Sequence, residues 1–92
     1  MIKTFRHKGL EAYFRTGGKA GIQPDHTGKL ARQLERLDRA RCANDMNVPG
    51  WKLHPLAGDL RGHLSVWVSG NWCLAFAFDG EDAVLVDYQD YH

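Results

Sequence analysis

The hydrophobic period of the chain changes near residue 50, and this change constrains the fold more than any other feature. Before that point apolar side chains recur at helical spacing, as in Leu30, Leu34 and Leu37. After it, apolar and aromatic residues form short strand-like runs separated by glycine-containing turns. Helices followed by strands predict the α+β class: two N-terminal helices packed on a small antiparallel β-sheet. With 92 residues there is room for one domain only, over residues 1–92.

Two helices are expected in the first half of the chain. A strand-like lead-in over residues 2–6 precedes a helix over residues 8–15, which ends at a glycine-rich segment. The second helix is expected to begin near Pro24, with Asp25 as its N-cap, and to end near residues 41–44. Its three leucines cover an arc of about 60°, which predicts a stripe buried against the sheet.

Four strand segments are expected in the second half, and the second and third of them are joined by a tight turn. A short strand over residues 51–54 is ended by Pro55, and a β-branched and aromatic strand covers residues 64–68. Gly70-Asn71 is a typical two-residue hairpin turn. The unbroken apolar run over residues 83–86 predicts a central strand buried on both sides.

The hairpin turn predicts a register and two different faces. It places Val68 opposite Cys73, with Val66 opposite Ala75 and Trp67 opposite Leu74. One face then holds the aromatic core under the helices: Trp67, Trp72, Leu74, Phe76 and Phe78. The other face holds small residues and is expected to be an open binding surface with Cys73 exposed on it: Val66, Val68, Cys73, Ala75 and Ala77.

Charge is distributed unevenly along the chain. Residues 1–41 contain ten Lys and Arg against four Asp and Glu, and residues 42–92 contain two against seven. Four of the cations lie opposite the leucines on the second helix, within about 80° of arc: Lys29, Arg32, Arg36 and Arg39. Such a stripe fits either a polyanion surface, most commonly a phosphate backbone, or a solvated helix face.

Several classes of protein are excluded by the pattern. The longest apolar run has seven residues, over 72–78, far short of the roughly 18 that a membrane helix needs. The first residues lack the apolar core of a secretory signal, so a cytoplasmic protein without membrane partners is expected. Two cysteines, Cys42 and Cys73, without a C-x-x-C pair favour neither a disulfide framework nor a zinc site.

Two segments of the chain carry side chains that are suited to proton transfer. His54 stands where a strand enters a loop, a common position for catalytic groups, although a structural histidine bonded at a strand end fits equally well. The ending Asp90-Tyr91-His92 sets an acid, a phenol and an imidazole directly after a hydrophobic strand, where they can supply a general base and a general acid. His7 and His26 lie in polar stretches and are expected at the surface.

Motifs along the whole chain resemble one family. They are Ile2-Lys3-Thr4-Phe5, His7-Lys8-Gly9-Leu10, Lys52-Leu53-His54-Pro55-Leu56 with Gly58, Gly70-Asn71-Trp72, and Asp87-Tyr88 with the terminal Asp90-Tyr91-His92. This pattern is similar to that of the HigB toxins, members of the RelE/ParE superfamily of bacterial toxin–antitoxin modules. The resemblance implies a RelE/ParE-like fold and an mRNA endonuclease that acts in the ribosomal A site. It also implies a HigA-like antitoxin, and contact with operator DNA only through that antitoxin.

The resemblance also implies which residues act. The family's catalytic positions match His54, Asp90, Tyr91 and His92. The implied reaction is attack of a ribose 2′-OH on its own phosphate by general acid–base catalysis, without a metal or another cofactor. Which group is the base and which the acid stays open. Cations expected to contact ribosomal RNA or mRNA are Lys29, Arg32, Arg36, Arg39, Lys52 and Arg61.

Two positions depart from the family pattern. Relatives carry an arginine where this chain has Cys73, and often a lysine where it has Ala57. Both missing groups are cations expected near the scissile phosphate, so the departures predict weakened cleavage. They also favour an alternative: a non-catalytic protein on the same fold, acting as an antitoxin partner and corepressor or as an inhibitor of a protein target.

Overall fold

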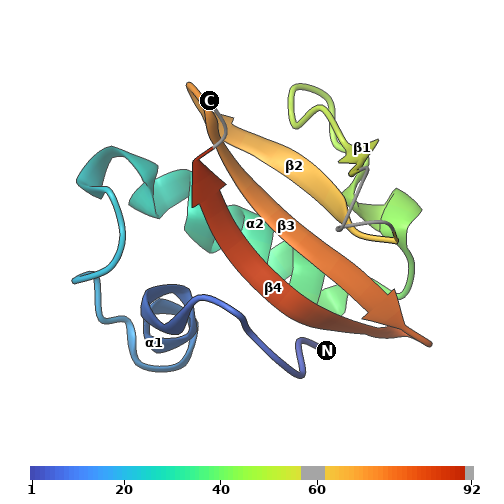
Figure 1. Ribbon diagram of the computed structural model, residues 1–92, viewed down its shortest axis with the longest axis horizontal. Coiled ribbons are helices and arrows are strands. Elements are labelled where there is room, and N and C mark those ends of the chain that lie inside the picture. Colours follow the sequence, from blue (N-terminus) through green and yellow to red (C-terminus); the bar gives the residue numbers. More distant parts are fainter. Residues whose placement is uncertain (57–61, 91–92) are drawn as a thin grey trace.

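The computed structural model describes residues 1–56 and 62–90. Along the chain the elements are α1 (Lys8–Thr16), η1 (Pro24–His26), α2 (Thr27–Arg39), η2 (Ala43–Met46), β1 (His54–Pro55), β2 (Leu64–Ser69), β3 (Trp72–Asp79) and β4 (Asp82–Asp90). The strands form an antiparallel sheet in the order β1-β2-β3-β4, with α2 crossing one face and α1 beside β4 (Figure 1). This confirms the α+β class. In the described part of the chain, no helix is long and apolar enough to cross a membrane.

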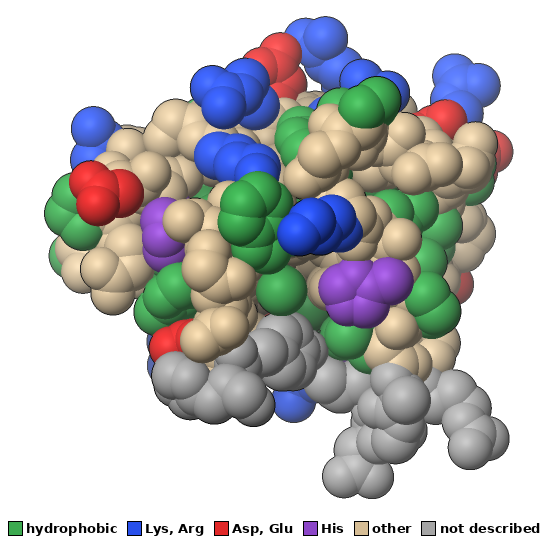
Figure 2. Space-filling model, turned by 90° about the horizontal axis from the view of Figure 1, so that it is seen from above, with side chains coloured by type: hydrophobic (Ala, Val, Ile, Leu, Met, Phe, Trp, Pro, Cys, Tyr) green, Lys and Arg blue, Asp and Glu red, His purple; other side chains and the backbone are tan. Residues whose placement is uncertain are grey.

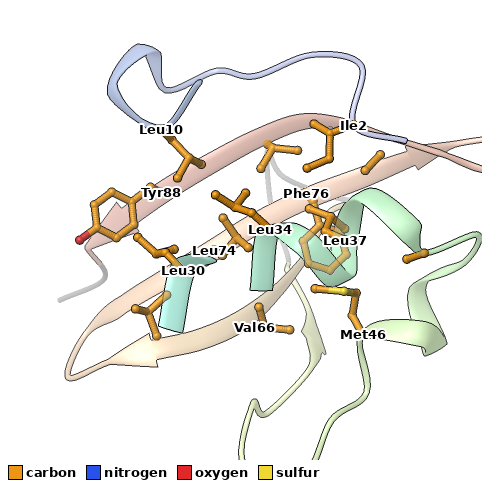
Figure 3. Packing of buried hydrophobic residues seen from close by; sticks show 14 of the residues in the cluster. Ile2, Leu10, Leu30, Leu34, Leu37, Met46, Val66, Leu74, Phe76 and Tyr88 are labelled. Carbon is orange, nitrogen blue, oxygen red and sulfur yellow. The ribbon is translucent and has the colours of Figure 1, made fainter. Parts of the chain in front are cut away.

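The leucine stripe of α2 forms the centre of the core, as predicted. Leu30 and Leu37 have no exposed surface and Leu34 is 2% exposed. They pack with side chains of the helix-covered sheet face and of α1, which Figure 3 shows from close by: Leu10, Val66, Leu74, Phe76 and Tyr88. Burying a leucine of this kind contributes roughly 1.5–3 kcal/mol, so the stripe holds helix and sheet together.

Both ends of α2 differ from the prediction. The 3-10 turn η1 leads directly into the helix, and no side chain caps its start, so Asp25 is not the N-cap. The helix ends at Arg39, because Ala40 is extended with ψ 143°. Just beyond, the backbone N–H of Arg41 donates to Oδ2 of Asp45 at 2.9 Å. This contact turns the chain into the separate turn η2 instead of continuing the helix.

The Gly70-Asn71 turn is confirmed, but the predicted register is wrong. Trp67 pairs with Cys73 and Val66 pairs with Leu74, with a bulge at Val68. The bulge allows Val66 and Val68 both to be buried in the core, at 0% and 2% exposure. It moves Trp67 out of the core and onto the same face as Cys73.

The segment predicted as a strand over residues 51–54 turns instead of extending. Lys52 adopts the left-handed conformation with φ 53°. The strand β1 then has two residues only, His54 and Pro55, paired with Ser65 and Leu64. Proline is tolerated there because β1 is an edge strand and needs no N–H on its open side.

The strand β4 is not a central strand buried on both sides. It is the last strand of the sheet, and Leu85 has φ 55° and is 40% exposed. Residues Ile2 and Phe5 form parallel bridges to Ala83 and Val86, so the predicted strand-like lead-in covers the outer edge of β4. Covering an edge in this way protects it from pairing with other chains.

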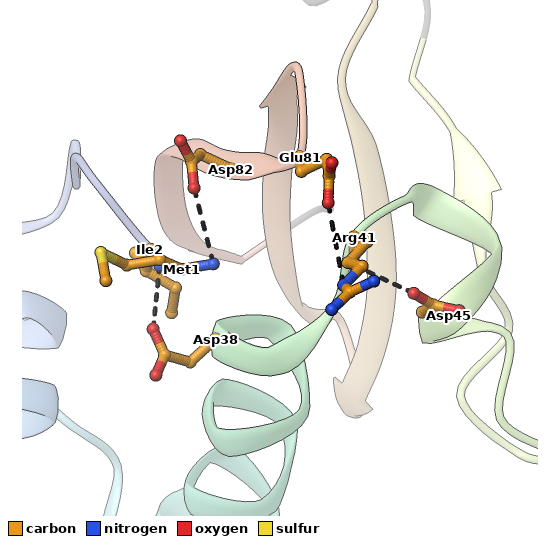
Figure 4. Close-up of polar contacts among 7 residues, drawn as sticks. All are labelled: Met1, Ile2, Asp38, Arg41, Asp45, Glu81 and Asp82. Atoms are coloured by element: carbon orange, nitrogen blue, oxygen red, sulfur yellow. Dashed lines mark hydrogen bonds and ion pairs between the residues drawn. The ribbon is translucent and has the colours of Figure 1, made fainter.

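Polar contacts tie the N-terminus to the end of α2 and to the β3–β4 turn (Figure 4). The backbone N–H of Ile2 donates to Oδ1 of Asp38 at 2.9 Å, and the terminal amine of Met1 lies 3.7 Å from Asp82. Arg41 reaches Glu81 at 3.7 Å. Exposed ion pairs of this kind each contribute at most about 1 kcal/mol, so they orient the segment more than they stabilise it.

Candidate functional site

One row of cross-strand partners runs across the whole sheet on the face away from α2. His54 pairs with Ser65, Ser65 with Ala75, and Ala75 with Asp87. Since neighbouring strands lie about 4.8 Å apart, this row spans about 14 Å. The next row on the same face holds Trp67, Cys73 and Gln89. We call these two rows the open face, because α2 does not cover them, although their central side chains Ser65, Ala75 and Cys73 are buried.

The imidazole of His54 is held in one orientation. Its Nδ1 lies 2.7 Å from the carbonyl oxygen of Lys52, which can only accept, so Nδ1 carries the proton. In the neutral ring the lone pair is therefore on Nε2, which lies 3.2 Å from Oγ of Ser65. The left-handed turn at Lys52 places its carbonyl oxygen within hydrogen-bond distance of Nδ1. A strained backbone of this type costs on the order of 1–3 kcal/mol and is often found at functional sites.

Cys73 is not the exposed residue that the sequence predicted. It lies on β3 between two neighbouring strands and is 8% exposed, beside the fully buried Ser65. Burial raises the pKa of the Cys73 thiol, although a hydrogen bond with Ser65 acts in the opposite direction. The thiol is therefore neutral at neutral pH and supplies no charge to the open face.

A carboxylate that the sequence reasoning missed lies at the far end of the row. Asp87 accepts from the backbone N–H of Tyr88 at 2.9 Å, and from Nε2 of Gln89 at 2.6 Å. Ser65 was missed as well. The alternation of side chains along β2 and β4 would have placed Ser65 and Asp87 on this face if the register had been known.

The proposed catalytic residues are not all brought together in the described part of the chain. Asp90 pairs with Trp72 and alternates with Tyr88, so it belongs to the face opposite His54, at the end of β4. Tyr91 and His92 lie outside the described residues. Ala57 and Arg61 also lie outside them.

The basic stripe lies on the solvent side of α2, as expected. Arg32, Arg36 and Arg39 are exposed and Lys29 is half-buried. Arg39 pairs with Glu35 at 3.1 Å, and Nε of Arg36 donates to the carbonyl of Asp45 at 2.7 Å. The arginines line a hollow of about 490 Å³ between α2 and the following loop, together with Glu35, Ala40, Asp45, Val48 and Trp51. Figure 2 shows cationic side chains gathered on this side of the molecule.

Two lysines from different segments meet at one aromatic ring. Nζ of Lys29 lies 4.1 Å from the ring centroid of Trp67, and Nζ of Lys52 lies 4.8 Å from it. Burial lowers the pKa of Lys29, and the positive charges of Arg32 and Lys52 lower it further. Cations at such distances from a tryptophan ring are attracted by the negative face of the ring.

The two histidines expected at the surface have structural contacts. His26 is 7% exposed, and its Nδ1 lies 2.5 Å from the hydroxyl of Tyr88. His7 is half-buried, and its Nδ1 accepts from the backbone N–H of Leu10 at 2.9 Å, which caps α1. The His26 contact depends on how η1 packs on β4, 62 positions further along the chain, whereas the His7 contact is a local cap that its place just before the helix could have indicated.

Comparison with known proteins gives consistent matches over the whole chain. A family model described as RelE-like toxin of type II toxin-antitoxin system HigB matches residues 3–92. Endoribonuclease HigB from Proteus vulgaris is 38% identical over 92 residues, covering 100% of both chains. Toxin HigB-1 from Vibrio cholerae serotype O1 is 32% identical over 95 residues, covering 100% of this chain and 98% of the relative. A crystal structure of a YafQ mutant from E. coli shares the fold, with a TM-score of 0.53 at 13% identity over 98% of this chain and 93% of that one.

Proposed function

Because the chain belongs to the HigB-like family of RelE-like toxins of type II toxin–antitoxin systems, we propose that it is an endoribonuclease that cuts mRNA in the ribosomal A site. The observation that carries the proposal is the orientation of His54, with its Nε2 lone pair directed to the open face next to Ser65. A relative 38% identical over the full length is named an endoribonuclease, which supports the same activity.

The proposed reaction needs two proton transfers and no metal. A base takes the proton of a ribose 2′-OH, and the 2′-oxygen forms a bond to the neighbouring phosphorus. The bond from phosphorus to the 5′-oxygen of the next nucleotide breaks, and an acid gives that oxygen a proton. The products are a 2′,3′-cyclic phosphate and a 5′-OH end.

Four residues are proposed for these steps. His54 suits one proton transfer because its unprotonated Nε2, which accepts only one long hydrogen bond from Oγ of Ser65, can take a proton or, once protonated, return it. His92 is proposed for the other transfer, and Tyr91 for stacking on a base or bonding the phosphate. Asp90 is proposed to orient one of these groups from the end of β4.

The proposed partners follow from the family. A HigA-like antitoxin is proposed to neutralise the protein and to provide its only link to operator DNA. The exposed cations of α2 are proposed to bind ribosomal RNA of the small subunit during action on mRNA in the cytoplasm.

A second candidate function is favoured by one observation. The neutral, buried Cys73 offers no positive charge at the centre of the open face. A protein with this fold that binds an antitoxin or a target protein without cleaving RNA would need no positive charge there.

Primer extension on an mRNA translated in vitro separates the two functions. The nuclease predicts new 5′ ends within the reading frame only when ribosomes translate, and these ends of the downstream fragments should carry a 5′-OH. A pattern of 5′ ends that does not differ from a reaction without the protein would favour the binding function.

A further inference from the structure

We propose that Lys29 and Lys52, held against the ring of Trp67, form a binding site for a backbone phosphate of the RNA strand that reaches His54. The inference rests on the proposed nuclease function and adds to it the group that holds the substrate's phosphate. The proposed lysine site is distinct from the arginines of α2, which line a different hollow.

One hydrogen bond holds the ring of Trp67, and two more hold its backbone. Its indole Nε1 donates to the carbonyl of Gly70 at 2.9 Å. Its backbone N–H donates to the carbonyl of Trp51 at 2.6 Å, and its own carbonyl accepts from the buried Nε2 of Gln33 at 2.9 Å. A ring held in this way gives both lysines a defined place to lie.

The two ammonium groups lie near each other, because both contact the Trp67 ring. Both lie over the same ring, so their separation is no more than the sum of their distances to its centroid, about 9 Å. A phosphodiester has two charged oxygens that can each accept at about 2.8 Å from an amine, so one phosphate can contact both ammonium groups where they approach the same edge of the ring.

The electrostatics favour an anion between them. Within residues 1–56 and 62–90, neither Lys29 nor Lys52 pairs with a carboxylate. Each repels the other, and the lowered pKa of Lys29 is consistent with that repulsion and with its partial burial. A phosphate would relieve the repulsion without displacing an ion pair formed among the described residues.

The location connects this site to the proposed chemistry. Trp67 is the cross-strand partner of Cys73, next to the row that contains His54 and Ser65. The carbonyl of Lys52 is also the acceptor for Nδ1 of His54, so the same residue holds the imidazole and one of the cations. A phosphate bound at Trp67 would therefore direct an RNA strand to the Nε2 side of the imidazole. An acidic segment of a protein partner offers no such reason to lie beside His54.

Binding of an RNA that cannot be cut tests the site independently of activity. The probe is a single-stranded oligoribonucleotide with a 2′-O-methyl group at every position, followed by fluorescence anisotropy over a salt series. Each cation that contacts a single-stranded phosphate contributes a slope of about 0.7 to the fall of log K with log salt. We expect Lys29→Gln and Lys52→Gln each to reduce the slope by about 0.7, and the double variant by about 1.4.

Matched control variants distinguish the loss of a phosphate contact from other effects of a substitution. Lys19→Gln removes an exposed lysine of the loop after α1 and should leave the slope unchanged. Lys29→Arg and Lys52→Arg keep the charge and should keep the slope. Thermal unfolding of each variant checks that the fold is intact.

The site is overturned if the double variant has the same slope as Lys19→Gln, or if the unaltered chain does not bind the probe at low salt. It is also overturned if the double variant loses binding of the antitoxin but not of the probe. Cleavage of translated mRNA is scored separately. If the chain cuts mRNA while the slopes stay unchanged, only the phosphate site fails. If the slopes change while no mRNA is cut, only the proposed nuclease function fails.

Discussion

Replacing His54 by asparagine tests the role of its Nε2 atom most directly. The amide nitrogen of asparagine lies close to the place of Nδ1 and can keep the donation to the carbonyl of Lys52, which is 2.7 Å away in the unaltered chain. Asparagine has no atom where Nε2 now lies, 3.2 Å from Oγ of Ser65. The change therefore removes the atom proposed for proton transfer and keeps the contact that shapes the turn.

The expected effects on rate and on stability differ widely. General acid–base catalysis by one group is typically worth 10²–10⁴ in rate, or about 2.7–5.4 kcal/mol of barrier. The stability cost should be below about 0.5 kcal/mol, because His54 is exposed and its hydrogen bond to Ser65, which asparagine cannot form, is long. His54→Asn should thus cut mRNA at least about 100-fold more slowly with a nearly unchanged unfolding midpoint.

The assay is quantitative primer extension on translated mRNA with equal amounts of folded protein. His7→Asn is the matched control, because asparagine keeps a good N-cap for α1 and lies away from the open face. A rate for His54→Asn within about threefold of the unaltered chain would refute a role in proton transfer, since a missing base costs far more than that.

Other changes test the fold around the site. Cys73→Arg should lower the free energy of unfolding by about 1–3 kcal/mol, because only 8% of Cys73 is exposed; an unchanged urea midpoint would show that the open face adapts at no cost. His7→Ala should lose about 1 kcal/mol through the missing cap, and a loss as large in His7→Asn would contradict that cause. Burial raises the pKa of Tyr88, so the unaltered chain should lose stability as the pH rises above about 10, the unfolded value, whereas Tyr88→Phe should lose less. At neutral pH the same variant should be about 1 kcal/mol less stable without the hydrogen bond to His26; parallel stability curves over pH would contradict the assignment. Gln33→Glu places a carboxyl group where no surface is exposed. The stability of this variant relative to the unaltered chain should be highest at low pH and should fall as the pH rises past about 4.3. A loss of stability that is the same at all pH values would contradict this burial.

The core could be predicted from the sequence because its signals are local. Three leucines at i, i+4 and i+7 fix one buried side of a helix, and Gly70-Asn71 fits few conformations other than a tight hairpin turn. Both features appear in the structure as expected. His54 could also be found, since a histidine between a strand and a loop is visible in the sequence.

The register of the hairpin could not be predicted, and with it the composition of each face. One inserted residue at Val68 exchanges the faces on either side of it. Whether a bulge forms depends on the space under α2, where Val66 and Val68 are both buried, and no local pattern reports that space. Because of the bulge, Trp67 lies beside Cys73 and not in the core, where the sequence predicted it.

The sequence by itself determined the class of fold, the buried stripe of α2, the hairpin turn and the family. These depend on interactions between residues close along the chain or on motifs that can be read directly. The tertiary structure alone decided that Ser65 meets His54, that Cys73 is buried, and that Lys29 and Lys52 share the ring of Trp67. The physical reason is that each of these contacts joins residues 11 or more positions apart, whose meeting is set by strand register and helix packing.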